Sequence, residues 1–151
     1  MNIKKLADFL VEAKKNTYAK GIEAKKLKGG LKEFTFRKGN FRYVDKYSGE
    51  KFFFGEETVF AGKKAVWFMD YAGGVKRSAK NHKEIYSFLR KALALVDAKK
   101  PFRGPKKFTK GKFSYSNTPK WGANWFRGHE IIKESGRVVY SLDYVGCNLS
   151  E

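Results

Sequence analysis

The feature that most limits the fold of this chain is an internal repeat. Residues 36–43, FRKGNFRY, recur 72 positions later as FTKGKFSY at residues 108–115. After one inserted residue the offset becomes 73, and the matches continue as Glu57 with Glu130, Val66 with Val139, Trp67 with Tyr140, Met69 with Leu142, Asp70 with Asp143, Tyr71 with Tyr144 and Gly73 with Gly146. This order indicates a duplicated unit of roughly 70 residues. We expect a single domain, residues 1–151, with repeat one at about 3–75 and repeat two at about 81–147.

Each copy begins with a helical pattern. Apolar residues recur at helical spacing in both copies, at Ile3, Leu6, Ala7, Leu10 and Ala13 and again at Ile85, Phe88, Leu89, Ala92 and Leu95. Asn81 followed by Glu84 resembles a capping box in front of the second helix. The pattern therefore predicts two amphipathic helices, one at the start of each repeat.

Strand-like segments follow each helix. They cover residues 34–37, 41–45, 51–61 and 65–72 in the first copy, and 108, 113–116, 124–133 and 137–145 in the second, with hairpin turns at Lys38-Gly39-Asn40 and Gly62-Lys63. The last strand of each copy alternates, which predicts a core under the helices made of Trp67, Met69, Tyr71, Tyr140, Leu142 and Tyr144. The expected fold is α+β: an antiparallel sheet or two half-sheets, two helices packed on one face, and a pseudo-twofold axis between the halves.

Charge and composition limit the class of protein. The 151 residues include 33 Lys and Arg and 15 Asp and Glu, which gives a net charge of +18. This charge bears on partners and solubility rather than on the fold. A hydrophobic content of 42% favours a packed core over a disordered polycation. One cysteine, Cys147, excludes an internal disulfide and Cys-rich zinc modules. His82 and His129 lack an i, i+4 partner, so we expect no metal and no cofactor.

The sequence contains no signal-peptide core, no transit peptide and no apolar run of membrane-spanning length. With a single cysteine, this favours a reducing compartment, and the cytoplasm is the expected location. Oligomeric state is not indicated by any pattern in the chain.

No known catalytic motif is present, which favours a non-enzymatic protein. The repeated acids Glu57 and Glu130, and Asp70 and Asp143, are the candidates for acid–base chemistry, since a duplicated fold can bring two carboxylates together at its axis. A hydrolase of this kind requires Glu57 and Glu130 within about a nanometre of each other. The alternative is structural: duplication left these acids to cap turns or pair with lysines, Asp70 and Asp143 standing just before glycine-containing turns.

A basic segment with interleaved aromatic residues is a candidate site for nucleic acid or another polyanion. No acidic residue occurs between Asp97 and Glu130, a stretch that holds Lys99, Lys100, Arg103, Lys106, Lys107, Lys110, Lys112, Lys120 and Arg127. These cations would contact phosphates, and bases would stack on Trp121 and Trp125. The alternative is a solvated basic face, which the excess of Lys over Arg and the lack of a named binding motif favour.

Two further candidates lie where the repeats meet. Trp67, Tyr71, Tyr140 and Tyr144 would line a small-ligand pocket between the repeats, which would make the chain a regulatory sensor domain. Pro101-Phe102-Arg103-Gly104-Pro105 is a stiff loop. It either holds Arg103 for anion binding or links the repeats with Phe102 as a plug in the core.

Several segments resemble a known family: Phe9–Lys15 (FLVEAKK), Thr17-Tyr18-Ala19, Phe41–Asp45 (FRYVD), Phe54–Glu57 (FGEE), Val66–Tyr71 (VWFMDY) and Pro101–Pro105 (PFRGP). The chain resembles a small bacterial and archaeal domain-of-unknown-function family that in some members follows an Xre-type helix-turn-helix. The resemblance spans about residues 6–147 and implies a stand-alone copy of a module that senses a ligand or partner; it supplies no catalytic residues.

Two departures from that family stand out. The chain is more basic than the resemblance implies, which favours a polyanion partner of its own. It also has Cys147-Asn148-Leu149 where a second glycine would match Gly73-Gly74.

Overall fold

The computed structural model describes residues 3–122 and 124–149, which form two α-helices and one continuous nine-stranded antiparallel sheet. The helical elements are α1 (Ile3–Asn16), η1 (Tyr18–Lys20), η2 (Lys28–Gly30) and α2 (His82–Leu93). The strands are β1 (Lys25–Lys26), β2 (Lys32–Lys38), β3 (Phe41–Gly49), β4 (Phe52–Ala61), β5 (Lys64–Val75), β6 (Lys107–Lys110), β7 (Phe113–Trp121), β8 (Trp125–Glu134) and β9 (Arg137–Asn148). The α+β prediction is confirmed.

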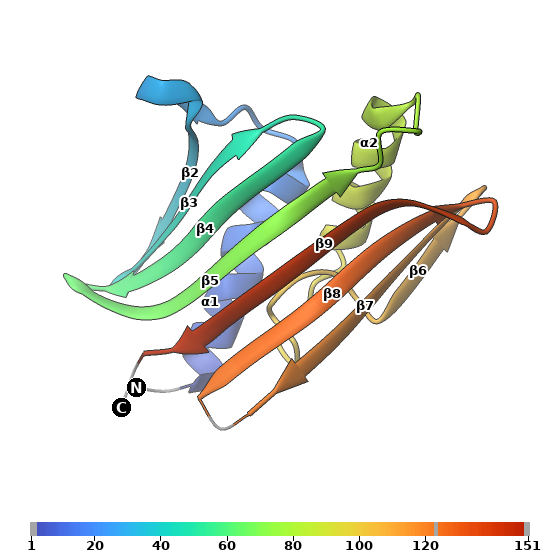
Figure 1. Ribbon diagram of the computed structural model, residues 1–151. Coiled ribbons are helices and arrows are strands. Elements are labelled where there is room, and N and C mark those ends of the chain that lie inside the picture. Colours follow the sequence, from blue (N-terminus) through green and yellow to red (C-terminus); the bar gives the residue numbers. More distant parts are fainter. Residues whose placement is uncertain (1–2, 123, 150–151) are drawn as a thin grey trace.

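The strand order is β1-β2-β3-β4-β5-β9-β8-β7-β6, so each half of the chain supplies one side of the sheet (Figure 1). The halves join where β5 pairs with β9, with Tyr71 opposite Tyr144. Of the two arrangements that the sequence left open, the structure therefore has the single sheet.

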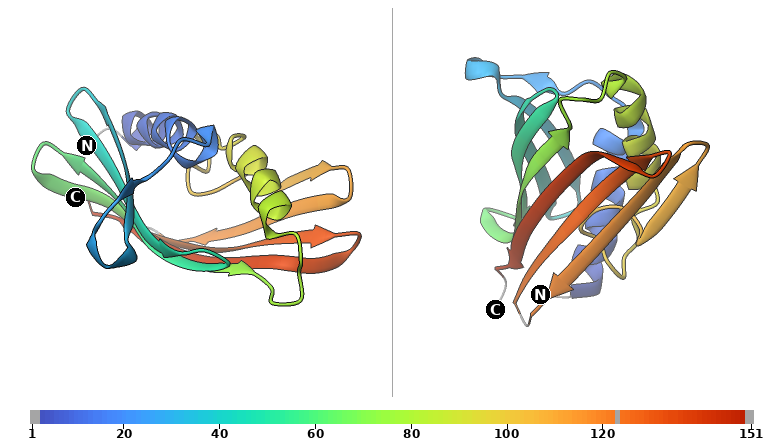
Figure 2. Two further views of the ribbon diagram at one scale, coloured as in Figure 1. Left: turned by 90° about the horizontal axis from the view of Figure 1, so that it is seen from above. Right: turned by 45° about the vertical axis from the view of Figure 1, so that its right-hand side comes forward.

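Both helices lie on the same side of the curved sheet (Figure 2). Their apolar faces contact strand residues directly: Phe9 of α1 lies 5.1 Å from Phe41 of β3, and Phe88 of α2 lies 5.2 Å from Phe113 of β7, between ring centroids. Leu95 differs from the prediction, because α2 ends at Leu93 and the Leu95 side chain is 49% exposed. None of the helices in the described part of the chain is long and apolar enough to cross a membrane.

The alternation predicted for the last strand of each copy is confirmed. Buried side chains at these positions form one core cluster with both helices, namely Trp67, Met69, Tyr71, Tyr140, Leu142 and Tyr144. The predicted turns are also present: Gly39 and Gly62, with φ of 56° and 58°, sit in the short connections β2–β3 and β4–β5. Such tight hairpins need positive φ, which glycine adopts without steric penalty.

The prediction of glycine-containing turns directly after Asp70 and Asp143 is wrong. Asp70 lies inside β5 opposite Val145, and Asp143 lies inside β9 opposite Ala72. The glycine that follows serves close strand contact instead, because a Cβ at Gly73 would lie 2.3 Å from the backbone oxygen of Ser141.

The capping box at the start of α2 is also not formed as predicted. A capping box needs an oxygen of the Asn81 side chain to accept a backbone N–H. Instead Nδ2 of Asn81 donates to the carboxylates of Glu84 at 2.7 Å and Glu134 at 3.2 Å, and no side-chain bond caps the helix. The two flanking carboxylates draw the amide nitrogen toward them, so Asn81 joins α2 to β8.

Candidate functional site

A cavity of about 730 Å³ lies between the helices and the first half of the sheet. Its wall includes exposed residues such as Glu23, Glu50 and Lys83 and buried residues such as Asp45 and Glu57. The cavity therefore leads from the protein surface to polar groups in the core. Among the described residues, no group of three or more His, Cys, Asp or Glu is placed to hold a metal ion.

Four residues at the inner end form what we call the first polar cluster: Lys14, Asp45, Glu57 and Tyr71. All four are buried and line the cavity. Nζ of Lys14, from α1, donates to Oε2 of Glu57. The hydroxyl of Tyr71 donates to Oδ1 of Asp45 at 2.6 Å. Asp45 and Glu57 are directly opposite each other on β3 and β4, which places two carboxylates beside one ammonium group.

The charges of this cluster are unequally matched. Burial raises the pKa of Asp45 to about 7, and the Glu57 carboxylate adds to the rise, against the hydrogen bond from Tyr71 and the charge of Lys14. Burial also lowers the pKa of Lys14, although Glu57 opposes that change. Because the Lys14 ammonium is bonded to Glu57, Asp45 is the carboxylate without a cation of its own. Asp45 therefore exchanges its proton near neutral pH.

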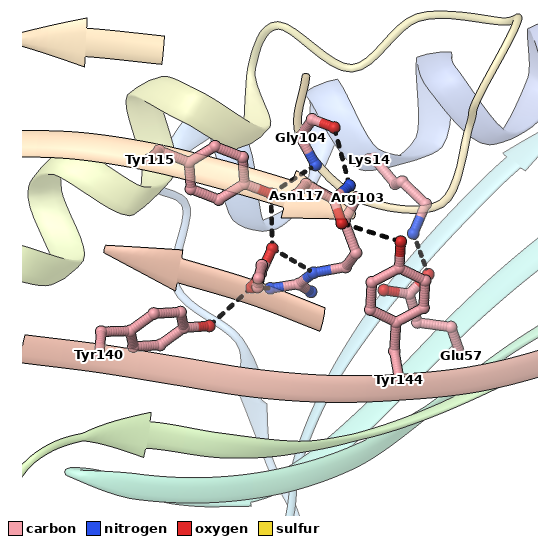
Figure 3. A network of polar contacts seen from close by, with 9 residues as sticks. Lys14, Glu57, Arg103, Gly104, Tyr115, Asn117, Tyr140 and Tyr144 are labelled. Atoms are coloured by element: carbon pink, nitrogen blue, oxygen red, sulfur yellow. Dashed lines mark hydrogen bonds and ion pairs between the residues drawn. The ribbon is translucent and has the colours of Figure 1, made fainter. Parts of the chain in front are cut away.

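A second polar cluster lies at the other half of the sheet (Figure 3), and its contacts involve Arg103, Tyr115, Asn117, Glu130, Tyr140 and Tyr144. Arg103 donates through Nε at 3.2 Å and Nη2 at 2.6 Å to the two oxygens of Glu130. The hydroxyls of Tyr115 and Tyr140 donate to the same carboxylate at 2.6 and 2.7 Å. Glu130 is 0% exposed and lies outside the wall of the cavity.

These bonds determine how Glu130 ionises. Burial alone would raise the pKa of Glu130, but the charge of Arg103 and the hydrogen bonds from Arg103, Tyr115 and Tyr140 outweigh it and hold the pKa below its usual value. Glu130 is thus a fully bonded group in the core whose ionised form these contacts favour.

The two clusters share one local arrangement. Tyr144 donates to Oδ1 of Asn117 at 2.9 Å, as Tyr71 does to Asp45, and Asn117 is opposite Glu130 as Asp45 is opposite Glu57. Each of these tyrosines also crosses a glycine on the next strand, where an added Cβ would lie 2.3 Å (Gly55) or 2.2 Å (Gly128) from the hydroxyl.

The sequence analysis missed Lys14, Asp45 and Asn117 as site residues. A signal was present, because Asp45 and Asn117 occupy the same repeat position, 72 residues apart and two after the matched Tyr43 and Tyr115. A polar residue at a core-facing strand position in both of the similar segments indicates a side chain that needs a hydrogen-bond partner inside the protein. Lys14 carried no such signal, since it lies in a lysine-rich helix.

The acids predicted to meet at the axis do not share one cleft. β4 and β8 are separated by β5 and β9, so the strands of Glu57 and Glu130 lie three inter-strand spacings of about 4.8 Å apart. Each carboxylate is bonded to a different cation. Asp70 and Asp143 are exposed on the opposite face of the sheet, where Asp143 pairs with Nδ1 of His129 at 2.7 Å.

The residues of the predicted basic track occupy different environments. Arg103 is 7% exposed and bonded to Glu130, and Lys112 pairs with Glu84 and Glu134. The others are exposed: Lys99, Lys100, Lys106, Lys107, Lys110, Lys120 and Arg127. Several interleaved aromatics belong to the core, including Phe102, which stacks on Phe126 at 4.0 Å and so acts as the core plug that was one interpretation of its loop.

Trp121 and Trp125 are the exposed aromatics of this segment, at 55% and 49%. A cation lies over each ring: Nζ of Lys100 is 5.2 Å from the Trp121 centroid, and the Arg127 guanidinium is 5.8 Å from that of Trp125.

The four rings predicted to line a pocket between the repeats are all buried. Tyr71 lines the cavity, and Trp67 lies 5.5 Å from Nζ of Lys14. Tyr140 and Tyr144 belong to the second polar cluster. The structure thus brings Tyr71 to the wall of this cavity but not Trp67, Tyr140 or Tyr144. Tyr71 and Tyr144 also line a second, more open hollow, to which residues of both halves contribute.

Comparison with known proteins gives one match. No curated protein and no solved structure shows a significant similarity to this chain. A family model described as a domain of unknown function, DUF5680, matches residues 45–149, from Asp45 on β3 to Leu149 just after β9. The match includes the whole second polar cluster, and Asp45, Glu57 and Tyr71 of the first. Since it covers more than half of the chain, the protein belongs to the DUF5680 family.

Proposed function

We propose that this protein is a non-enzymatic domain that binds a small ligand in the cavity between the helices and the sheet. The observation that carries the proposal is the cavity itself, about 730 Å³, which ends at the buried carboxylates of Asp45 and Glu57. Small-molecule sites typically measure about 300–1,000 Å³ and combine apolar walls with a few convergent polar groups.

The wall has that mixed character. Leu89 and Leu93 of α2 and Val96, which follows α2 in the chain, form an apolar side of the wall. Phe53 and Phe102 add aromatic rings. The buried groups Lys14, Asp45, Glu57 and Tyr71 form the first polar cluster, and exposed charged residues such as Glu23, Glu50 and Lys83 line the wall as well. A ligand that entered would exchange water for an apolar wall and find hydrogen-bonding groups already in place, which suits a sensor with a regulatory role.

We also infer that the two halves arose by duplication, related by a pseudo-twofold axis between β5 and β9. Three features support this inference: the sheet order reads outward as β5-β4-β3-β2 on one side and β9-β8-β7-β6 on the other, the Tyr–Asx hydrogen bond recurs, and so does the glycine under each tyrosine. In this view the two halves inherited the same polar arrangement, and the ligand site is the copy in the first half, which borders the cavity.

The test uses the fluorescent probe 1-anilinonaphthalene-8-sulfonate with the wild-type chain and two variants. Ala19→Trp places a large ring into the cavity, because Ala19 lines it and is half-buried. Phe54→Ser alters an exposed aromatic on the outer face of the sheet and serves as the matched control. We expect the probe to bind the wild type and Phe54→Ser alike, and Ala19→Trp about tenfold more weakly, with melting curves that show all three folded. Probe binding that survives Ala19→Trp but is lost in Phe54→Ser would move the site to the outer face.

A second candidate function rests on the exposed tryptophans beside cations. Trp121 with Lys100, and Trp125 with Arg127, offer the pairing of ring and charge that single-stranded nucleic acid uses. We would titrate labelled single-stranded and duplex oligonucleotides by fluorescence anisotropy at two salt concentrations. Binding should weaken steeply with salt and in the triple variant Lys106→Glu, Lys107→Glu, Lys110→Glu. Affinity that is unchanged by salt and by this variant would eliminate the candidate.

A further inference from the structure

We propose that the cavity takes a ligand with two unlike ends: a delocalised N–H-donating head, such as a guanidinium group or the guanine edge, held by Asp45, and an anionic tail held by Arg90. This inference rests on the proposed function and names the ligand class of the same site. It follows from two charged groups on the cavity wall, Asp45 and Arg90, that have no oppositely charged partner among the described residues.

Asp45 is the buried carboxylate of the first polar cluster that has no cation bonded to it among the described residues. It is 6% exposed, and among the described residues its side chain receives one hydrogen bond, from Tyr71 to Oδ1. Its second oxygen, Oδ2, is left for an occupant of the cavity that Asp45 lines. The nearby cations are already bonded, Lys14 to Glu57 and Arg103 to Glu130. A buried carboxylate in this position is stabilised by N–H donors from outside the protein.

Aromatic rings extend from Asp45 along the wall. The ring of Phe53 meets those of Tyr71 and Tyr86 edge to face, each at 5.9 Å between centroids, so three rings run from the partner of Asp45 to α2. All three line the cavity. A flat, delocalised head gains from such surroundings through stacking and cation–π contacts, whereas a compact, strongly hydrated ammonium gains less.

Arg90, on the same cavity wall, has no carboxylate partner among the described residues, and its guanidinium contacts the Tyr18 side chain. Its Nε is buried without a hydrogen-bond partner, and within the described residues Arg90 takes part in no ion pair. Its guanidinium lies 5.8 Å from the Tyr18 ring on the cavity wall. An unsatisfied buried N–H is costly, and a carboxylate or phosphate is the group that an arginine binds best.

Further charged residues line the cavity besides Arg90. Lys32 and Lys83 lie on the same wall, as do the acids Glu23 and Glu50, which are exposed and, among the described residues, pair with no part of Arg90.

The two ends lie within range of one ligand. Tyr47 lines the same cavity: burial raises the pKa of its hydroxyl, the charge of Asp45 raises it further, and the charge of Arg90 lowers it. One phenol therefore interacts electrostatically with both groups. Since the volume suits a molecule of metabolite size, a single ligand can contact Asp45 and Arg90 together.

The test is isothermal titration calorimetry with two molecules that carry this chemistry from different sources, L-arginine and GMP. Each is compared with its counterpart without the tail, agmatine and guanosine, and inorganic phosphate represents the tail alone. We expect at least one complete molecule to bind about tenfold more tightly than its tail-less counterpart and than phosphate. Which of the two binds identifies the source of the head.

Variants assign the ends. Asp45→Asn should weaken the binding of the complete molecule about tenfold or more, since the substitution replaces a charged hydrogen-bond acceptor with a neutral one. Arg90→Met should remove the advantage of the complete molecule over its tail-less counterpart. Lys91→Met, on the next residue of α2 but exposed and outside the cavity wall, is the matched control and should change neither.

The outcomes separate this inference from the proposed function. If 1-anilinonaphthalene-8-sulfonate binds in the cavity but neither complete molecule exceeds its counterpart or phosphate, the ligand class is wrong and the cavity remains a binding site. Binding of a complete molecule that is unaffected by both Asp45→Asn and Arg90→Met also overturns the ligand class. If the probe does not bind either, the proposed function fails together with it.

Discussion

The two polar clusters occupy matching places on one sheet, but one is open and the other is closed. In the second cluster Glu130 is bonded to Arg103, Tyr115 and Tyr140, whereas in the first Glu57 is bonded to Lys14 and Asp45 to Tyr71. The difference begins with single positions. Trp67 stands where Tyr140 supplies a hydroxyl, and Asp45 stands where Asn117 supplies an amide.

A loop completes the difference. The loop 101–105 covers the second cluster: the Gly104 N–H donates to the Tyr115 hydroxyl at 3.1 Å, and Nδ2 of Asn117 donates to the Gly104 oxygen at 3.1 Å. The first cluster borders the cavity, and so does Arg103 of this loop, whose guanidinium is already bonded to Glu130. The comparison indicates that the same polar positions stabilise the core where the loop bonds to them, whereas Asp45 receives, among the described residues, only the hydrogen bond from Tyr71.

The largest expected effect concerns the closed cluster. Arg103→Met leaves the Glu130 charge buried without its cation, and we expect a loss of about 3–5 kcal/mol in the free energy of unfolding. Urea denaturation at pH 7 measures it. The double variant Arg103→Met, Glu130→Gln should recover part of that loss. A loss below about 1 kcal/mol for the single variant would show that the closed cluster contributes little to stability.

The same change in the open cluster should cost less. Lys14→Met removes the cation beside Glu57, but water in the cavity can hydrate the carboxylate, so we expect a loss of about 1–3 kcal/mol by the same denaturation. The comparison depends on the ranking. If Lys14→Met destabilises the protein as much as Arg103→Met, the first cluster is as closed to water as the second.

Asp45→Asn should stabilise the protein at high pH. The groups that face Asp45 are Glu57 from β4, Lys14 from α1, Tyr71 from β5 and Arg103 from the loop after α2. The pKa of Asp45 is raised to about 7 in the folded chain, against about 3.9 when unfolded, so the folded state binds more protons between these values. Asp45 thus lowers the stability of the wild type progressively as pH rises from about 4 to 7.

Replacement by Asn removes that titration while keeping an acceptor for Tyr71, as Asn117 does for Tyr144. Relative to the wild type, the variant should gain on the order of 1–3 kcal/mol at pH 8 and nothing near pH 4. Thermal and urea unfolding from pH 4 to 8 measure the difference. The reciprocal change Asn117→Asp should destabilise at neutral pH, because it removes the donor to the Gly104 oxygen. A pH-independent difference between Asp45→Asn and the wild type would contradict the assignment.

The smallest effects belong to the matched tyrosines. Tyr144→Phe removes a neutral hydrogen bond and should cost about 0.5–1.5 kcal/mol at any pH between 5 and 8. Tyr71→Phe should cost a similar amount at pH 5 and more at pH 8, where its partner Asp45 is charged. A double-mutant cycle of Tyr71→Phe with Asp45→Asn at both pH values isolates the pair. If the stability cost of Tyr144→Phe depended on pH and that of Tyr71→Phe did not, the titrating partner would belong to the second cluster and not to the first.

The sequence predicted the helices and strands more completely than it predicted the residues of the site. Periodicity located both helices and placed Tyr71 and Tyr144 in the core, because burial of alternate residues follows directly from strand geometry. It assigned Arg103 to a basic surface track, since its neighbours in sequence are lysines and no local pattern distinguishes it. Arg103 is instead drawn into the core, where Glu130, 27 residues later, provides the charge that makes burial of a guanidinium tolerable.

The sequence by itself determined the α+β class, the order of helices and strands, and the positions where both copies carry Glu and Tyr. These are consequences of local periodicity and of a repeat that is visible residue by residue. Only the tertiary structure decided which cation meets which carboxylate, that Glu57 and Glu130 remain apart, and that Asp45 and Arg90 border one cavity. The physical reason is that ion pairing and cavity formation depend on distances between segments far apart in the chain, and these distances are set only when the helices pack on the curved sheet.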